Sequence, residues 1–102
     1  MSDINILGTN YKFEIVEEKF EGLDGSDGGI TKYFEKKIYV NGDNEEISDL
    51  NRVIRHEIIH AFLYESGLPE YSHDEKIVDW LAMQIPKIVK IYESLEKQEN
   101  DK

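Results

Sequence analysis

Apolar residues alternate with polar ones in the N-terminal part of the chain, which is the period of a half-buried β-strand. The clearest alternation, over residues 11–17, runs through Tyr11, Phe13 and Ile15. A short strand over 4–7 should precede it, and a β-rich run over 33–40 follows it. The pattern predicts a small antiparallel β-sheet formed by about residues 1–42.

Residues 22–29 and 41–43 interrupt these runs with glycine, asparagine and aspartate. The segment Asn41-Gly42-Asp43 is typical of a turn. The longer segment is rich in acidic residues, but it lacks the spacing of an EF-hand calcium loop and the glutamate that closes one. We therefore interpret 22–29 as a hairpin connection between the longer strands.

From Ile47 the apolar period becomes helical and predicts a helix over about 45–66. Gly67 then occupies the position of a left-handed C-terminal cap, and Pro69 prevents continuation. The expected buried stripe, at steps of three and four residues, consists of Ile47, Leu50, Ile54, Ile58, Ala61 and Phe62. The residues that remain for an exposed strip are Arg52, Arg55, Ile59 and Ser66.

A second helical pattern begins near residues 72–74 and continues to about residue 96. Pro86 lies inside it and should kink or interrupt the helix. The polar segment 96–102 should be frayed. Sheet and helices together predict an α+β fold in a single domain, which suits a chain of 102 residues.

Composition narrows the chemistry that this domain can perform. The chain has no cysteine, so disulfides and thiolate metal sites are excluded, and histidine and carboxylate remain as the strong metal ligands. A formal net charge of −10 disfavours binding to nucleic-acid phosphates and to anionic membranes. Without a signal-like segment or a long apolar stretch, we expect a soluble, cytoplasmic protein.

The first predicted helix carries the pentapeptide His56-Glu57-Ile58-Ile59-His60. Residues four apart on a helix lie one above the other, so both imidazoles can bind the same metal ion. Glu57 lies about 100° around the helix from His56 and can reach a water on that ion without binding the ion itself. Two neutral nitrogen ligands, an open coordination position and a carboxylate base are what a zinc hydrolase requires.

A catalytic zinc usually has three protein ligands, and the candidates for the third are His73, Asp74, Glu75 and Asp79. We favour Glu75, because residues 68–74 are long enough to return past His60 to a neighbouring helix. Asp79 follows one turn later and could orient His56 as a carboxylate partner. His73 stays an alternative ligand. Glu75 could instead complete a capping box with Ser72.

These residues resemble a known pattern. His56-Glu57-x-x-His60 followed by Glu75-x-x-x-Asp79 is similar to a compressed form of the gluzincin metallopeptidase motif. The run from Arg55 through Gly67 to Trp80 resembles small zinc peptidases encoded by phages and prophages of Firmicutes. The resemblance covers about residues 55–88 and implies a minimal zincin-like fold, with a glutamate ligand and an aspartate that supports the first histidine.

The expected function is zinc-dependent hydrolysis of a peptide bond in a peptide or protein substrate. His56, His60 and Glu75 would hold Zn²⁺, and Glu57 would be the general base. Tyr71, His73 or Tyr64 could stabilise the oxyanion. The alternative is a non-catalytic zinc-binding domain that acts as a protein-interaction module, in which Glu57 would have no use.

Overall fold

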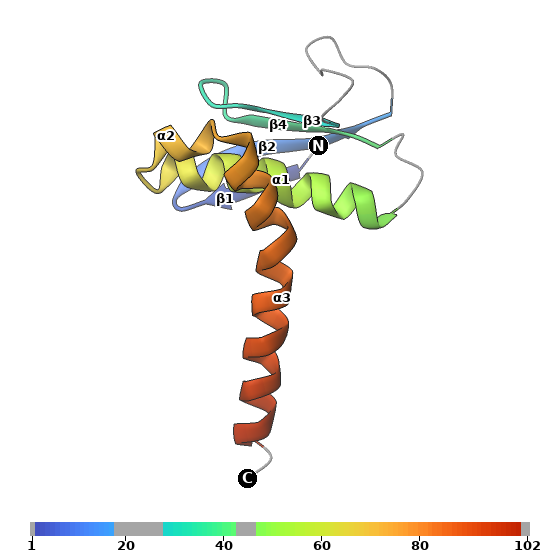
Figure 1. The fold of residues 1–102 in the computed structure, drawn as a ribbon. Coiled ribbons are helices and arrows are strands. Elements are labelled where there is room, and N and C mark those ends of the chain that lie inside the picture. The colour runs from blue at the N-terminus through green and yellow to red at the C-terminus, as the bar shows by residue number, and fades with distance from the viewer. Residues whose placement is uncertain (1, 18–27, 43–46, 101–102) are drawn as a thin grey trace.

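The computed structural model describes residues 2–17, 28–42 and 47–100 of the chain. It is an α+β structure in which a four-stranded sheet is followed by helices, as the sequence predicts (Figure 1). One long helix lies along the sheet, and a second one extends away from the body of the molecule (Figure 1). None of the described helices is long and apolar enough to span a membrane.

The sheet contains β1 (Ser2–Ile6), β2 (Thr9–Val16), β3 (Gly29–Lys32) and β4 (Lys37–Asn41), in the order β1-β2-β4-β3. The outer pairs are antiparallel, but β2 and β4 are parallel, with Phe13 opposite Ile38. The sheet is therefore mixed, and the prediction of an antiparallel sheet is wrong. Parallel pairing between distant segments leaves no local signature in the sequence.

The connections between the strands also differ from the prediction. Residues 22–29 lead from β2 to β3, which are not neighbours in the sheet, so they do not form a hairpin, and Gly29 already belongs to β3. Residues 22–27 themselves lie outside the described part. The hairpins are formed instead by Leu7–Gly8, with φ of 52° and 93°, and by the turn at 33–36, which interrupts the predicted strand 33–40.

The helices are α1 (Ile47–Glu65), the short α2 (Pro69–Ser72) and α3 (Glu75–Asn100). Gly67 ends α1 with φ of 92°, and the N–H of Leu68 returns to the carbonyl oxygen of Leu63 at 2.9 Å, as in a left-handed cap. Helix α3 runs through Pro86, so the helix is not interrupted there, and residues 96–100 of the segment predicted to be frayed are helical.

Two apolar clusters hold these elements together. The larger one joins the sheet to α1 and contains Ile6, Tyr11, Ile38, Val40, Val53 and Ala61. The smaller one forms where α3 crosses α1 and contains Ile59, Val78 and Ala82. Ile59 was predicted to be exposed but is buried by α3, whereas Phe62 was predicted to be buried but is 47% exposed. The apolar stripe of α1 is therefore rotated relative to the prediction, because α1 packs against two partners.

Candidate metal centre

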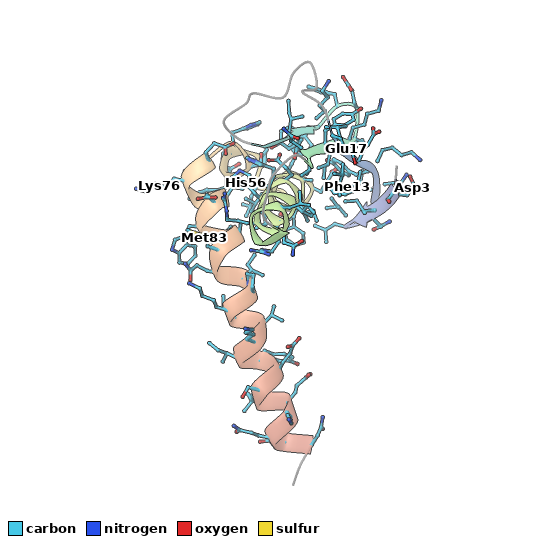
Figure 2. All side chains as sticks on the ribbon, turned by 90° about the vertical axis from the view of Figure 1, so that its right-hand side faces the viewer. Asp3, Phe13, Glu17, His56, Lys76 and Met83 are labelled. Carbon is cyan, nitrogen blue, oxygen red and sulfur yellow. The ribbon has the colours of Figure 1, made fainter. Side chains whose placement is uncertain are left out.

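The two motif histidines lie next to each other on α1, one turn apart, and both face the start of α3. Their Nε2 atoms are 3.1 Å apart. His60 is buried, and the His56 side chain is 12% exposed. Figure 2 shows His56 between the two long helices, with Lys76 and Met83 on α3. The spacing of four residues therefore brings both imidazoles to one point, as the sequence predicts.

Glu75, the first residue of α3, brings its carboxylate to the same point. Its Oε2 lies 2.9 Å from Nε2 of His56, and its Oε1 lies 3.0 Å from Nε2 of His60. The position of Glu75 follows from the cap of α3, because Oδ1 of Asp74 accepts the N–H groups of Lys76 and Ile77, both at 3.1 Å. Asp74 rather than Ser72 is the N-cap, so the capping-box interpretation of Glu75 is wrong.

The ring of His60 is oriented by its other nitrogen. Nδ1 lies 2.5 Å from the carbonyl oxygen of Ser72, which can only accept a hydrogen bond. Tyr33 donates its hydroxyl to the same carbonyl at 3.2 Å, and its oxygen is 3.3 Å from Nδ1. The proton of neutral His60 is therefore on Nδ1, and the lone pair is on Nε2. Burial, the largest effect, lowers the pKa of His60 and favours this neutral form.

His56 is oriented in a similar way by Asp79. Nδ1 of His56 lies 3.4 Å from Oδ1 of Asp79, and the same oxygen accepts a hydrogen bond from Nη1 of Arg52 at 3.0 Å. With a metal ion on Nε2, the carboxylate beside Nδ1 would hold the proton of His56 on that nitrogen. Asp79 thus occupies the position that the sequence predicts for it.

Four atoms that can bind a metal consequently converge. The Nε2 atoms of both imidazoles and two carboxylate oxygens lie 2.9–3.1 Å from their neighbours, and when both Nε2 atoms carry lone pairs this arrangement is electrostatically unfavourable unless a cation lies between them. Ligands at about 2.1 Å from a tetrahedral metal ion such as zinc are roughly 3.4 Å apart, so these atoms would have to move apart by only about 0.3–0.5 Å to hold one. His56, His60 and Glu75 could therefore hold a metal ion between them.

Glu57 lies beside this group, on the side of the sheet. It is buried, and Thr31 of β3 donates its hydroxyl to Oε1 of Glu57 at 2.9 Å. Ligand atoms of His56, Glu57 and His60 all lie within 4.8 Å of one another. A Cβ at Gly29 would lie 2.9 Å from Cγ of Glu57, so the strand passes this close to the side chain only because residue 29 is glycine.

A cleft of about 510 Å³ opens on the other side of the group. His56 and Glu75 form part of its wall, and Trp80 and Met83 of α3 add apolar surface. The Trp80 side chain is 57% exposed. The candidate metal ligands are therefore accessible from solvent through a cleft with an aromatic wall.

The chain matches no protein-family model, no curated protein and no solved structure. The interpretation of the site consequently rests on its own geometry. The structure brings together five of the residues singled out from the sequence, namely His56, Glu57, His60, Glu75 and Asp79.

The predicted oxyanion donors are less closely placed. Tyr71 is 45% exposed, and its role stays a prediction. His73 is exposed, and its ring makes an edge contact with the ring of Tyr33, with 5.3 Å between the centroids. The ring of Tyr64 stacks on the ring of Tyr33, with 4.6 Å between the centroids. The place beside both Nε2 atoms that a third ligand would need is occupied by Glu75 and not by His73.

Sequence reasoning missed the groups that hold the ligands. Arg52, Tyr33 and the carbonyl of Ser72 orient the histidines and their partner, and Thr31 holds Glu57. A backbone carbonyl has no sequence signal, since every residue has one. Thr31 could have been found, because Gly29-Ile30-Thr31 alternates like a strand and places the glycine and the threonine on one face.

Proposed function

We propose that this protein is a zinc-dependent hydrolase that cleaves peptide bonds, with His56, His60 and Glu75 as the zinc ligands. The observation that carries the proposal is the convergence of two imidazole Nε2 atoms and one carboxylate, 2.9–3.1 Å apart. A second carboxylate, that of Glu57, lies within 4.8 Å of the ligand atoms of both histidines, and we assign it the role of base rather than that of a ligand. This is the residue set of a catalytic zinc centre rather than of a closed structural one.

The choice of zinc follows from the donor types. Calcium and magnesium prefer sites built from oxygen atoms, whereas two neutral imidazoles with one carboxylate suit zinc. Three protein ligands leave a coordination position open, and Glu75 is 62% exposed at the cleft. A structural zinc site would normally be closed by a fourth protein ligand.

When bound, zinc would lower the pKa of a coordinated water and polarise a carbonyl oxygen. The chain itself supplies the proton acceptor. The hydroxyl of Thr31 holds Oε1 of Glu57, and the carboxylate would accept a proton and return it to a leaving amine. Because the Glu57 side chain is buried between α1 and β3, its orientation is fixed before a substrate arrives.

The cleft supports a peptide as the substrate class. Trp80 and Met83 provide an apolar wall next to His56, which fits a large or apolar side chain close to the scissile bond. Lys76 and Arg52 line the same cleft and favour a substrate with a carboxylate or an acidic side chain. Arg52 already holds Asp79, so Lys76 is the cation we assign to substrate contact.

The test is a zinc titration combined with a peptide-library assay. Metal-free wild-type protein should bind one equivalent of zinc, and His60→Ala should abolish binding. Glu57→Gln should keep the fold and the zinc but lose all hydrolysis, because an amide cannot accept the proton. A wild-type chain that binds no zinc would refute the proposal. Zinc binding without hydrolysis of any library peptide would favour the non-catalytic module.

A further inference from the structure

The C-terminal part of α3 extends away from the rest of the protein, and its side chains stand clear of the other elements (Figures 1 and 2). Six large apolar side chains on this part are between 37% and 72% exposed, namely Ile85, Ile88, Val89, Ile91, Tyr92 and Leu95. An isolated helix in water would gain nothing from these residues. So many exposed apolar groups on one helix indicate an interaction surface.

The spacing of these residues selects a helix as the partner. Leu81, Ile85, Ile88, Tyr92 and Leu95 follow one another at alternating steps of four and three residues, the a and d positions of a coiled-coil heptad. At the N-terminal end of this stripe of residues, the apolar surface continues into a groove of about 390 Å³ between α1 and α3. The groove is lined by residues that include Phe62, Leu63, Leu81 and Ile85. Stripe and groove form one continuous apolar face.

We propose that this face binds the α3 helix of a second copy of the chain, in the antiparallel orientation. The charges of the helix support self-association. Although the chain has a net charge of −10, residues 85–100 contain three lysines and three glutamates. Residues 85–92 carry +2, from Lys87 and Lys90, and residues 93–100 carry −2. An antiparallel pair places each positive half beside the negative half of the other copy.

The apolar positions are complementary in the same orientation. In one antiparallel register Ile85 of the first copy lies opposite Leu95 of the second, and Ile88 lies opposite Tyr92. The two-fold axis repeats both pairs, which gives four apolar layers. The end of each helix, with Leu95, then lies beside Ile85 of the other copy, at the mouth of the apolar groove.

The surface available is sufficient for a dimer of moderate affinity. Each of the six exposed side chains contributes roughly 100 Å² of apolar surface, so a pair of copies would bury about 1,200 Å². This is the lower end of the range for specific interfaces. The groove residues Phe62 and Leu81 add to it. The inference does not involve the metal ligands, and it stands or falls independently of the proposed activity.

Sedimentation velocity of the full chain tests the dimer at protein concentrations from about 1 µM to about 300 µM. This range includes the dissociation constants expected of small interfaces. Wild type should change from monomer to dimer, and Ile88→Glu should stay monomeric throughout. Ser94→Glu adds the same charge on the opposite side of the helix and should dimerise like wild type. Unchanged helicity by circular dichroism verifies that both variants fold. A monomeric wild type, or a dimer that survives Ile88→Glu, would overturn the proposal.

Cysteine cross-linking tests the orientation, and the chain has no native cysteine to interfere. Ile85→Cys and Leu95→Cys chains, mixed and oxidised, should form the mixed disulfide. Neither variant should link to itself, because identical positions lie about 15 Å apart along the helix, beyond disulfide reach. The opposite result, with each variant linking to itself and no mixed product, would show a parallel pair and overturn the antiparallel assignment.

Discussion

Replacement of Glu75 by glutamine separates a metal ligand from an ordinary surface residue. In the metal-free protein the Glu75 carboxylate is 62% exposed and faces the imidazoles of His56 and His60. Such a contact contributes less than about 1 kcal/mol to stability. The amide of a glutamine could even donate a hydrogen bond to a histidine lone pair. Glu75→Gln should therefore leave the free energy of unfolding of the metal-free protein within about 1 kcal/mol of wild type.

Zinc affinity should respond very differently. Loss of a partner that only orients a ligand weakens metal binding by about 10- to 100-fold, so loss of a ligand itself should weaken it by at least about 100-fold. At the same saturating free zinc concentration, that change reduces the stabilisation by zinc by about 2.7 kcal/mol. Competition titration with a chelating dye measures the affinity, and urea unfolding with and without zinc measures the stabilisation.

Glu70→Gln is the matched control, because Glu70 is an exposed glutamate on the neighbouring α2 and is not among the site residues. It should match wild type in both assays. The reasoning would be refuted by wild-type zinc affinity in Glu75→Gln, or by a loss of more than about 2 kcal/mol in the metal-free protein. Wild-type affinity in Glu75→Gln together with a large loss in His73→Ala would transfer the third ligand to His73.

Further predictions follow from the groups around the ligands. Asp79→Asn should weaken zinc binding by about 10- to 100-fold in the same titration, and an unchanged affinity would remove Asp79 from the site. Thr31→Val should destabilise the protein by about 1–3 kcal/mol, and it should cost less when Glu57→Ala has already removed the carboxylate that the hydroxyl contacts, which a double-mutant cycle in urea measures; additive effects would contradict the side-chain contact. Because the pKa of His60 is lowered in the folded protein, the unfolded chain takes up a proton on this residue at a higher pH than the folded chain does. The metal-free protein should therefore lose stability below about pH 6.5, by at most about 1.4 kcal/mol per pH unit, and show no His60 contribution above it, whereas His60→Gln should show a shallower slope.

The helix that carries the motif could be predicted from the sequence because the signals that define it are local. Apolar spacing, the Gly67 cap and the i, i+4 histidines all act within a few turns of the chain. Glu75 could be found from the reach of a short connection. The tautomers of His56 and His60 could not, since they depend on a carbonyl and on a carboxylate whose places are known only once α2 and α3 have formed.

The sheet was harder to predict, because its central pairing is not local. The segments of β2 and β4 are each strand-like, but only packing against α1 makes them parallel neighbours with β3 on the outer side. The same cause explains Ile59. A hydrophobic pattern records that a residue can be buried, whereas the direction from which a second helix arrives decides whether it is.

The short connection between α1 and α3 also affects how the protein folds. His56 and Glu75 are only 19 residues apart, whereas the parallel pairing of β2 with β4 joins residues that are farther apart in the chain, such as Lys12 and Lys37. An ion held by His56, His60 and Glu75 would close a short loop of the chain. The entropy lost on closing such a loop is modest and comparable to the loss caused by a short cross-link. Zinc present during refolding would thus favour pairing of α1 with α3 before β2 pairs with β4, and part of its binding energy would already be realised in a chain that is not yet folded.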